Sequence, residues 1–164
     1  MILVCAGTQL PFPRLMQGVD AWCARHPDVR VHAQVGPGGA PLEHATSLEL
    51  LDPLAYGAAV DAAELIVSHA GMGVVLTAID RRKPLVVLPR LASRGEHRSE
   101  HQLQVSVDVL PKLGVHVARD EEHLRALLSG RHLLAPAHGR PGSERQGFLH
   151  ALRRATERAL EAAS

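Results

Sequence analysis

Residues 65–89, LIVSHAGMGVVLTAIDRRKPLVVLP, decide the fold. Two runs of mostly branched apolar residues, 65–67 and 85–88, have the length and composition of buried strands. The segment between them, residues 73–82, carries apolar residues at helical spacing. A strand, a helix and a strand in this order form a βαβ unit, whose two strands pair in parallel. The sequence therefore predicts an α/β protein built on a parallel sheet.

The remainder of the chain repeats this alternation of strands and helices. Further strands are predicted at residues 2–6, 29–35, 47–51 and 115–118. Helices are predicted at residues 13–26, 54–63, 103–110 and 120–128, the second of them capped by Asp52 and the last by Asp120. Strands that alternate with helices pair in parallel, and the helices cover both faces of the sheet. We therefore expect a single doubly wound, Rossmann-like domain with strand order 3-2-1-4-5-6.

The chain divides into three parts. Residues 1–129 contain all the predicted strands and form the expected domain. Residues 130–142 contain several Pro and Gly residues and are predicted to be a linker. Residues 143–164 are predicted to form a last helix, and one face of this helix carries Phe148, Leu152, Ala155 and Ala159. Two roles stay open for this helix, packing on its own domain and docking to a partner protein.

The composition is that of one globular domain. The chain has 164 residues, 46% of them hydrophobic, and no run of 18 apolar residues. Its first residues are expected to form a strand rather than a signal peptide. The two cysteines have no metal-ligand spacing and imply no disulfide framework, which favours the cytosol, and Cys5 and Trp22 are expected in the core. A net charge of +1 and few aromatic residues argue against a nucleic-acid-binding surface.

The segment SHAGMG, residues 68–73, joins a strand to the helix that follows it. Open parallel sheets bind ligands at the carboxyl ends of their strands. A helix that starts near Gly73 directs unpaired N–H groups toward that edge. Gly71 and Gly73 are expected to allow positive φ and the close approach of a phosphate. A strand-to-helix turn that needs glycine for its geometry alone explains the same residues, so both interpretations stay open at this point.

A dense polar cluster follows the last strand of the same unit, at residues 89–102, PRLASRGEHRSEHQ. Hydroxyl and phosphate groups are commonly recognised by polar side chains in such loops. Arg90 and Arg94 are candidate phosphate or partner contacts, although a solvated arginine is an equally good interpretation. Glu96 is a candidate sugar contact or, equally, a charge at the start of a helix.

The segments SHAGMGVVLTAIDRRKPLVVLPR and GEHRSEHQ, together with Ala6-Gly7-Thr8, resemble the donor-binding carboxy-terminal domain of family 28 glycosyltransferases. The stand-alone members of that family are more similar still. They are the catalytic subunit of the dolichol-linked N-acetylglucosaminyltransferase and the second subunits of two-component bacterial polysaccharide glycosyltransferases. The resemblance covers most of residues 1–128. It implies one GT-B half-domain, without an acceptor-binding domain in this chain.

The resemblance also implies which residues hold the donor, a UDP-sugar. Backbone N–H groups of residues 71–73, beside His69, are expected at the diphosphate, with residues 7–8 across the crevice and residues 101–102 at the sugar hydroxyls. Thr77 stands where many relatives have an acidic residue that binds the ribose, and its hydroxyl lacks charge assistance. The full set of expected donor-binding residues is Gly7, Thr8, His69, Gly71, Met72, Gly73, Thr77, Arg90, Glu96, His101 and Gln102.

The implied activity is transfer of a hexose, with inversion, from UDP to a lipid-linked (polyprenyl diphosphate) acceptor in polysaccharide or glycan synthesis. Amides that bind the departing diphosphate stabilise the transition state. The chain has no D-x-D motif, and no metal or other cofactor is expected. No residue is an assured general base. A membrane-anchored acceptor-binding subunit is expected to supply one and to hold the chain at the cytoplasmic membrane face.

Two alternatives belong to other classes of function. The missing carboxylate at Thr77 favours a non-catalytic nucleotide-sugar-binding or scaffold subunit. Residues 97–101, HRSEH, fit H-x-x-E-H, the inverted zinc-peptidase motif, but no obvious third ligand accompanies it.

Overall fold

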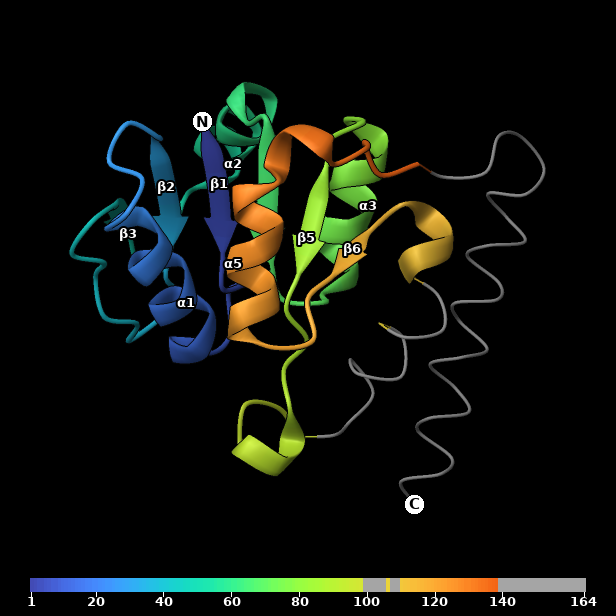
Figure 1. Cartoon of the computed structure of the whole chain (residues 1–164). Coiled ribbons are helices and arrows are strands. Elements are labelled where there is room, and N and C mark those ends of the chain that lie inside the picture. Colours follow the sequence, from blue (N-terminus) through green and yellow to red (C-terminus); the bar gives the residue numbers. More distant parts are fainter. Residues whose placement is uncertain (99–105, 107–109, 139–164) are drawn as a thin grey trace, which may run out of the picture.

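The protein is a six-stranded, wholly parallel sheet with helices on both faces (Figure 1). The computed structural model describes residues 1–98, 106 and 110–138. The strands lie side by side in the order β3-β2-β1-β4-β5-β6, so the predicted fold class and strand order are confirmed. The strands are β1 (Ile2–Cys5), β2 (Val31–Gln34), β3 (Thr46–Leu48), β4 (Leu65–Ser68), β5 (Leu85–Val87) and β6 (His116–Val117).

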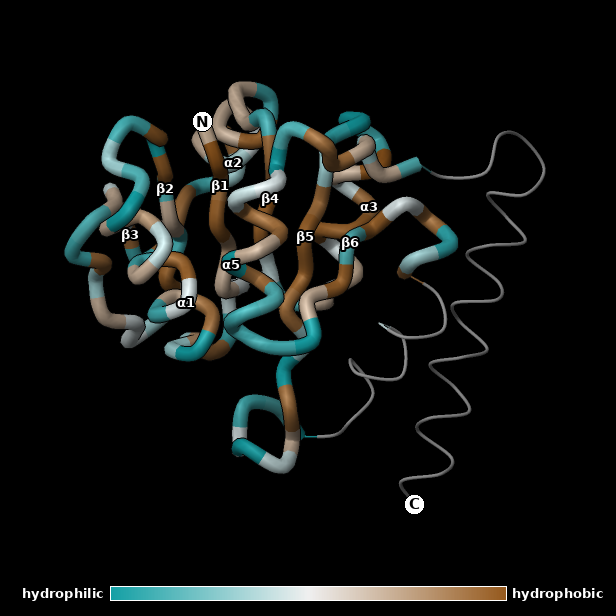
Figure 2. The backbone as a smooth tube through the Cα atoms, in the orientation of Figure 1, coloured by the Kyte–Doolittle hydropathy of each residue, from teal (hydrophilic) through white to brown (hydrophobic). Residues whose placement is uncertain are grey.

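Helices α1 (Pro13–Cys23) and α5 (Glu121–Ser129) cover one face of the sheet, and α2 (Pro53–Ala62) and α3 (Met72–Asp80) cover the other (Figure 1). Strand residues alternate between the two resulting cores because the side-chain period of a strand is two. In β1, Val4 packs toward α1 and α5, whereas Leu3 packs toward α2 and α3. The central strands are accordingly hydrophobic throughout, while polar residues lie on the surrounding loops and helices (Figure 2).

The helices begin where the sequence predicts caps. Asp52 accepts hydrogen bonds from the backbone N–H groups of Leu54 and Ala55, both at 2.9 Å, and Pro53 occupies the first position of α2. Asp120 caps α5 in the same way through the N–H of His123, at 2.7 Å. Three short 3-10 helices complete the described elements, at Ala92–Arg94, Leu110–Leu113 and Arg131–Leu133. Most of the helix predicted at residues 103–110 lies outside the described residues.

β3 is shorter than predicted. Its pairing with β2 ends at Leu48, and three residues later the N–H of Leu51 donates to the side-chain oxygen of Gln34 (3.0 Å). The same Gln34 side chain donates to the carbonyl of Gly7 (3.2 Å). One buried amide therefore joins the loops that follow β1 and β3 at the carboxyl edge of the sheet.

Residues 130–138, predicted as part of a linker, pack against the domain. The N–H of Ala137 donates to the carbonyl of Lys83 (3.0 Å), and the N–H of His138 donates to that of Leu113 (2.8 Å). Ala137 is buried in the core beneath α3. Residues 139–142 and the last helix predicted at 143–164 lie outside the described residues.

The predicted core positions of Cys5 and Trp22 are confirmed, because their side chains are 3% and 1% exposed. Burial raises the pKa of the Cys5 thiol to about 12, so this thiol is an inert part of the core. Within the described part of the chain, no helix combines the length and the apolar character that crossing a bilayer requires.

Candidate functional site

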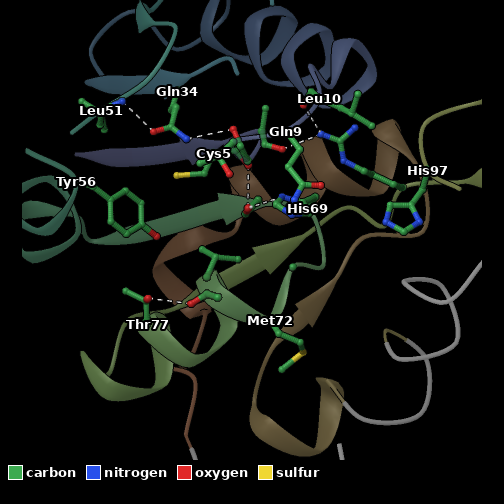
Figure 3. A pocket seen from close by; sticks show the side chains of 18 of the residues that line it. Cys5, Gln9, Leu10, Gln34, Leu51, Tyr56, His69, Met72, Thr77 and His97 are labelled. Atoms are coloured by element: carbon green, nitrogen blue, oxygen red, sulfur yellow. Dashed lines mark hydrogen bonds between the residues drawn. The ribbon is translucent and has the colours of Figure 1, made fainter. Parts of the chain in front are cut away.

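A cavity of about 620 Å³ opens at the carboxyl ends of β1 and β4, the two central strands (Figure 3). The loops after β1, β4 and β5 and the first turns of α2 and α3 surround it. The sequence predicted a crevice at this edge because parallel strands end there together. Of the predicted site residues, those that line the cavity are Gly7, Thr8, His69, Gly71, Met72, Gly73, Thr77 and Arg90. Glu96 does not line it, and His101 and Gln102 lie outside the described residues.

The imidazole of His69 lies between Gly7 and Gly71. A Cβ atom added at Gly7 would approach His69 Cε1 to 2.8 Å, and one added at Gly71 would overlap His69 Nε2. Gly7 also has a φ of 103°, which favours glycine. Gly71 has a φ of −82°, so the prediction of positive φ at this position is wrong. Gly71 is glycine because the histidine ring needs its space.

Gly73 has a different environment. It lies in the first turn of α3, outside the left-handed region, so the prediction of positive φ is wrong here too. Apart from its own helix backbone and its two neighbours in the chain, none of the described residues has a heavy atom within 4 Å of the position that a Cβ at Gly73 would occupy. The first intrahelical bond of α3 runs from the N–H of Val75 to the carbonyl of Gly71 (3.2 Å). The N–H groups of residues 72–74 precede that bond, and no side chain caps them. The turn therefore presents backbone donors beside open space, the arrangement that binds anions at helix N-termini.

The ring of His69 is neutral at physiological pH. Burial lowers its pKa to about 4, and the positive charge of Arg90 acts in the same direction. The Ser68 hydroxyl donates its hydrogen to the carbonyl of Cys5 (2.8 Å). In the 3.3 Å contact between Ser68 Oγ and His69 Nδ1, the imidazole is therefore the donor. Nε2 is then an acceptor, and it becomes a donor to a phosphate only after the ring gains a proton.

We predict that protonation of His69 destabilises the fold. An unfolded histidine titrates near pH 6.5 and the folded His69 near 4, so stability falls as the pH drops from about 6.5 to about 4. The contribution is at most about 3 kcal/mol, because each unit of pKa difference is worth about 1.4 kcal/mol. Urea unfolding at pH 7 and pH 4.5 should show a smaller pH dependence for His69→Gln than for the wild type. An NMR titration that gives His69 a pKa near 6.5 would contradict this account.

Arg90 is buried, with 4% of its surface exposed, so the interpretation of a solvated arginine is wrong. Its guanidinium donates to the carbonyls of Ala6 (2.8 Å), Leu10 (2.8 Å) and Pro11 (2.9 Å). It also lies 4.4 Å from the ring centroid of Phe12. Arg90 thus fixes the loop after β1, which forms one wall of the cavity.

Glu96 is bound to α1 instead of facing the cavity. Its carboxylate accepts from Arg14 Nε (2.7 Å) and Arg14 Nη2 (2.9 Å), and from the N–H of Leu91 (2.9 Å). Residues 96–98 form bends, and the start of the helix that would follow them lies outside the described residues. The carboxylate of Glu96 thus binds Arg14 and Leu91 and does not line the cavity where a sugar contact was expected.

Several cavity residues were not predicted. Tyr56 projects into the cavity from α2, and its pKa is raised by burial and lowered, to a lesser degree, by a hydrogen bond with Thr77 (Figure 3). Thr77 in turn donates its hydroxyl hydrogen to the carbonyl of Gly73 (2.8 Å). A sequence signal did exist for Tyr56, because the Asp52 cap places it in the first turn of a helix that starts beside the carboxyl ends of the strands. The remaining unpredicted lining residues include Leu10, Gln34 and Leu51, whereas His97 belongs to the polar cluster at residues 89–102.

The zinc-peptidase motif is described only at His97 and Arg98, and these residues form bends, not the helix that such a motif occupies. Glu100 and His101 lie outside the described residues. Among the residues that the structure does describe, the side chains that could gather around a metal ion are Asp20, Glu43 and His44, and His97 is not in that group.

The sheet and its cavity define the chain as a Rossmann-like domain with a cavity at the carboxyl edge of a parallel sheet, the edge at which such sheets bind ligands. Residues 1–126 match the sequence profile of the glycosyltransferase family 28 C-terminal domain. Because this match spans most of the chain, the protein belongs to that family and is a glycosyltransferase domain, as the sequence predicted. A search of curated proteins finds no match.

Three solved structures illustrate the shared fold. ALG13, solved by NMR, has a TM-score of 0.61 and 20% identity, over 92% of this chain and 94% of that one. The calicheamicin glycosyltransferase CalG4 has a TM-score of 0.54 and 20% identity, over 79% of this chain and 34% of that one. A putative UDP-N-acetylglucosamine 2-epimerase from Listeria monocytogenes has a TM-score of 0.51 and 17% identity, over 84% of this chain and 40% of that one. At such identities the likeness shows the fold alone.

Proposed function

We propose that this protein is the UDP-sugar-binding catalytic subunit of a two-component inverting glycosyltransferase. The observation that carries the proposal is the first turn of α3, where uncapped N–H groups adjoin open space over Gly73. A diphosphate bound there accepts hydrogen bonds from the amides and is favoured by the helix dipole. The family, and the UDP-sugar in the name of the Listeria epimerase, agree with this ligand class.

The cavity has two chemically different ends on either side of that turn. The apolar end, where Leu51 and Tyr56 lie, suits a uracil and its ribose (Figure 3). The polar end, where His97 lies, suits a hexose (Figure 3). Its volume of about 620 Å³ lies within the range of small-molecule sites, about 300–1,000 Å³. We assign the uridine to the apolar end and the sugar to the polar end, toward the expected contacts His101 and Gln102.

Amides at this turn stabilise the negative charge that develops on the leaving UDP, and this preferential binding of the transition state lowers the barrier to transfer. No metal ion is needed to explain that stabilisation. His69 is a weak base because its pKa is lowered to about 4, and its ring is enclosed between two glycines. We therefore assign the general base to the acceptor-binding partner.

The partner that we propose is a membrane-anchored subunit that binds a lipid-linked acceptor. The chain spans 34% of CalG4 and 40% of the epimerase, and in this proposal the partner supplies the elements that form the rest of such enzymes. The chain would then work at the cytoplasmic membrane face, held by its partner. Residues 143–164 are the candidate docking element.

A non-catalytic nucleotide-sugar-binding subunit is the second candidate function. The observation that favours it is that Thr77 uses its hydroxyl hydrogen on the carbonyl of Gly73 and brings no charge to the ribose. Calorimetry with a panel of UDP-sugars, alone and with the co-expressed partner, combined with a UDP-release assay, separates the two. Binding with turnover supports the transferase, binding without turnover for any sugar supports the scaffold, and no binding contradicts both.

A further inference from the structure

The loop after β5 presents a different residue to the cavity from the one that its sequence suggested. Glu96 points away from the cavity and toward α1, whereas the next residue, His97, lines the cavity wall (Figure 3). His97 also lies close enough to His69 for its charge to lower the pKa of that ring. His97, and not Glu96, is therefore the residue of this loop that is placed to contact a ligand directly.

The Glu96–Arg14 pair determines this orientation of the loop. Arg14 is 8% exposed, and besides Glu96 it binds the carbonyl of Pro89 (2.5 Å), at the point where the loop leaves β5. The other carboxylate contact of Glu96, with the N–H of Leu91, spans the loop from within. The backbone closes the same turn, because the N–H of Glu96 donates to the carbonyl of Leu91 (3.1 Å). The loop is thus tied to α1 on both sides of its 3-10 turn.

The position of His97 in the cavity determines which part of the ligand this side chain can contact. It lines the polar end of the cavity, opposite the apolar end that contains Leu51 and Tyr56 (Figure 3). With the uridine at the apolar end, as in the proposed function, the groups near His97 are those beyond the α-phosphate. These groups, the β-phosphate and the hexose hydroxyls, both accept hydrogen bonds from an imidazole N–H.

We propose that His97 binds the β-phosphate or the hexose of the donor and that Glu96 is the positioning residue that holds His97 there through Arg14. This inference rests on the proposed function and adds to it a contact and a support that the family match does not assign. In this proposal Glu96 orients the loop through its ion pair with Arg14 and does not contact the ligand.

The test of the contact compares calorimetric affinities for UMP, UDP and UDP-hexoses. His97→Ala should leave UMP affinity unchanged and weaken UDP, or UDP-hexoses alone, about tenfold, the loss of one hydrogen bond to a charged or polar ligand group. A loss that begins with UDP assigns the β-phosphate, and one that begins with UDP-hexoses assigns the sugar. The control is His132→Ala, an exposed histidine on the 3-10 turn after α5, which should change none of the affinities. Equal losses for all ligands, or none, would overturn the proposal.

The test of the support is a double-mutant cycle in the same assay. Glu96→Gln alone should lower the affinity ratio of UDP-hexose to UMP by at least threefold, and adding it to His97→Ala should lower the ratio no further. Additive losses would show that Glu96 does not act through His97. Asp61→Asn is the matched control, because it removes the Arg81–Asp61 ion pair of 2.6 Å, which is exposed on α2 and α3. A purely structural effect of Glu96→Gln would lower the melting temperature while leaving the ratio unchanged.

Failure of this inference is distinguishable from failure of the proposed function. If the wild type binds none of the three ligand types, with or without its partner, the proposed function fails and the inference fails with it. If the wild type binds them and the His97 and Glu96 variants match it, the inference alone is wrong.

Discussion

Replacing Gly73 with alanine should stabilise the protein and weaken its binding of UDP at least tenfold. A glycine inside a helix costs about 0.5–1 kcal/mol relative to alanine, and nothing in the described residues lies within 4 Å of a Cβ at this position. The methyl group would occupy the space that the diphosphate needs beside the N–H groups of α3. The melting temperature should rise by about 1–4 °C, measured by calorimetric scanning, while titration calorimetry records the loss of affinity.

Gly57→Ala is the matched control for this substitution. Gly57 lies within α2, also without a neighbour within 4 Å of its Cβ position, but it does not line the cavity. Its replacement should stabilise the protein similarly and leave UDP affinity unchanged. Unchanged UDP affinity in Gly73→Ala would mean that the space over Gly73 is not used by the ligand.

Replacing Arg90 with methionine should destabilise the protein by about 3 kcal/mol or more. The substitution leaves the carbonyls of Ala6, Leu10 and Pro11 without their donor, and each buried polar group that loses its partner costs about 1–3 kcal/mol. That loss is a large part of the 5–15 kcal/mol that stabilises a typical domain. UDP affinity should fall as well, because the loop after β1 forms a wall of the cavity.

Urea unfolding of Arg90→Met and Arg94→Ala measures this difference. Arg94 is 56% exposed and has a 3.3 Å ion pair with Glu121, so its replacement should cost about 1 kcal/mol or less. Similar losses for the two variants would contradict the assignment of Arg90 as the residue that fixes the loop.

The strand order and the place of the cavity were predictable from local signals. Strands β1, β4 and β5 are short, mostly apolar runs, and a helix follows β1, β3, β4 and β6, so the connection rules for such units leave few topologies. The caps at Asp52 and Asp120 were readable because they depend on residues two or three positions away. Features that depend on residues close together in the sequence were therefore predictable.

The roles of individual site residues were harder to predict because the residues they contact are distant in the sequence. Arg90 binds the carbonyl of Ala6, 84 positions earlier, and Glu96 binds Arg14, 82 positions earlier. Gly71 is glycine because the imidazole of His69, two residues away, occupies the space that a Cβ atom would need. The spacing of the glycines in the sequence does not reveal this. A sequence without its fold shows that these residues are polar or small, but not which group each one meets.

If the N–H groups at the start of α3 bind a diphosphate, an amide NMR titration with UDP should reveal it. UDP should shift the signals of Met72, Gly73 and Val74 more than those of the remaining amides, and uridine should not. A titration in which UDP is bound, as calorimetry records, and these three signals stay in place would contradict it.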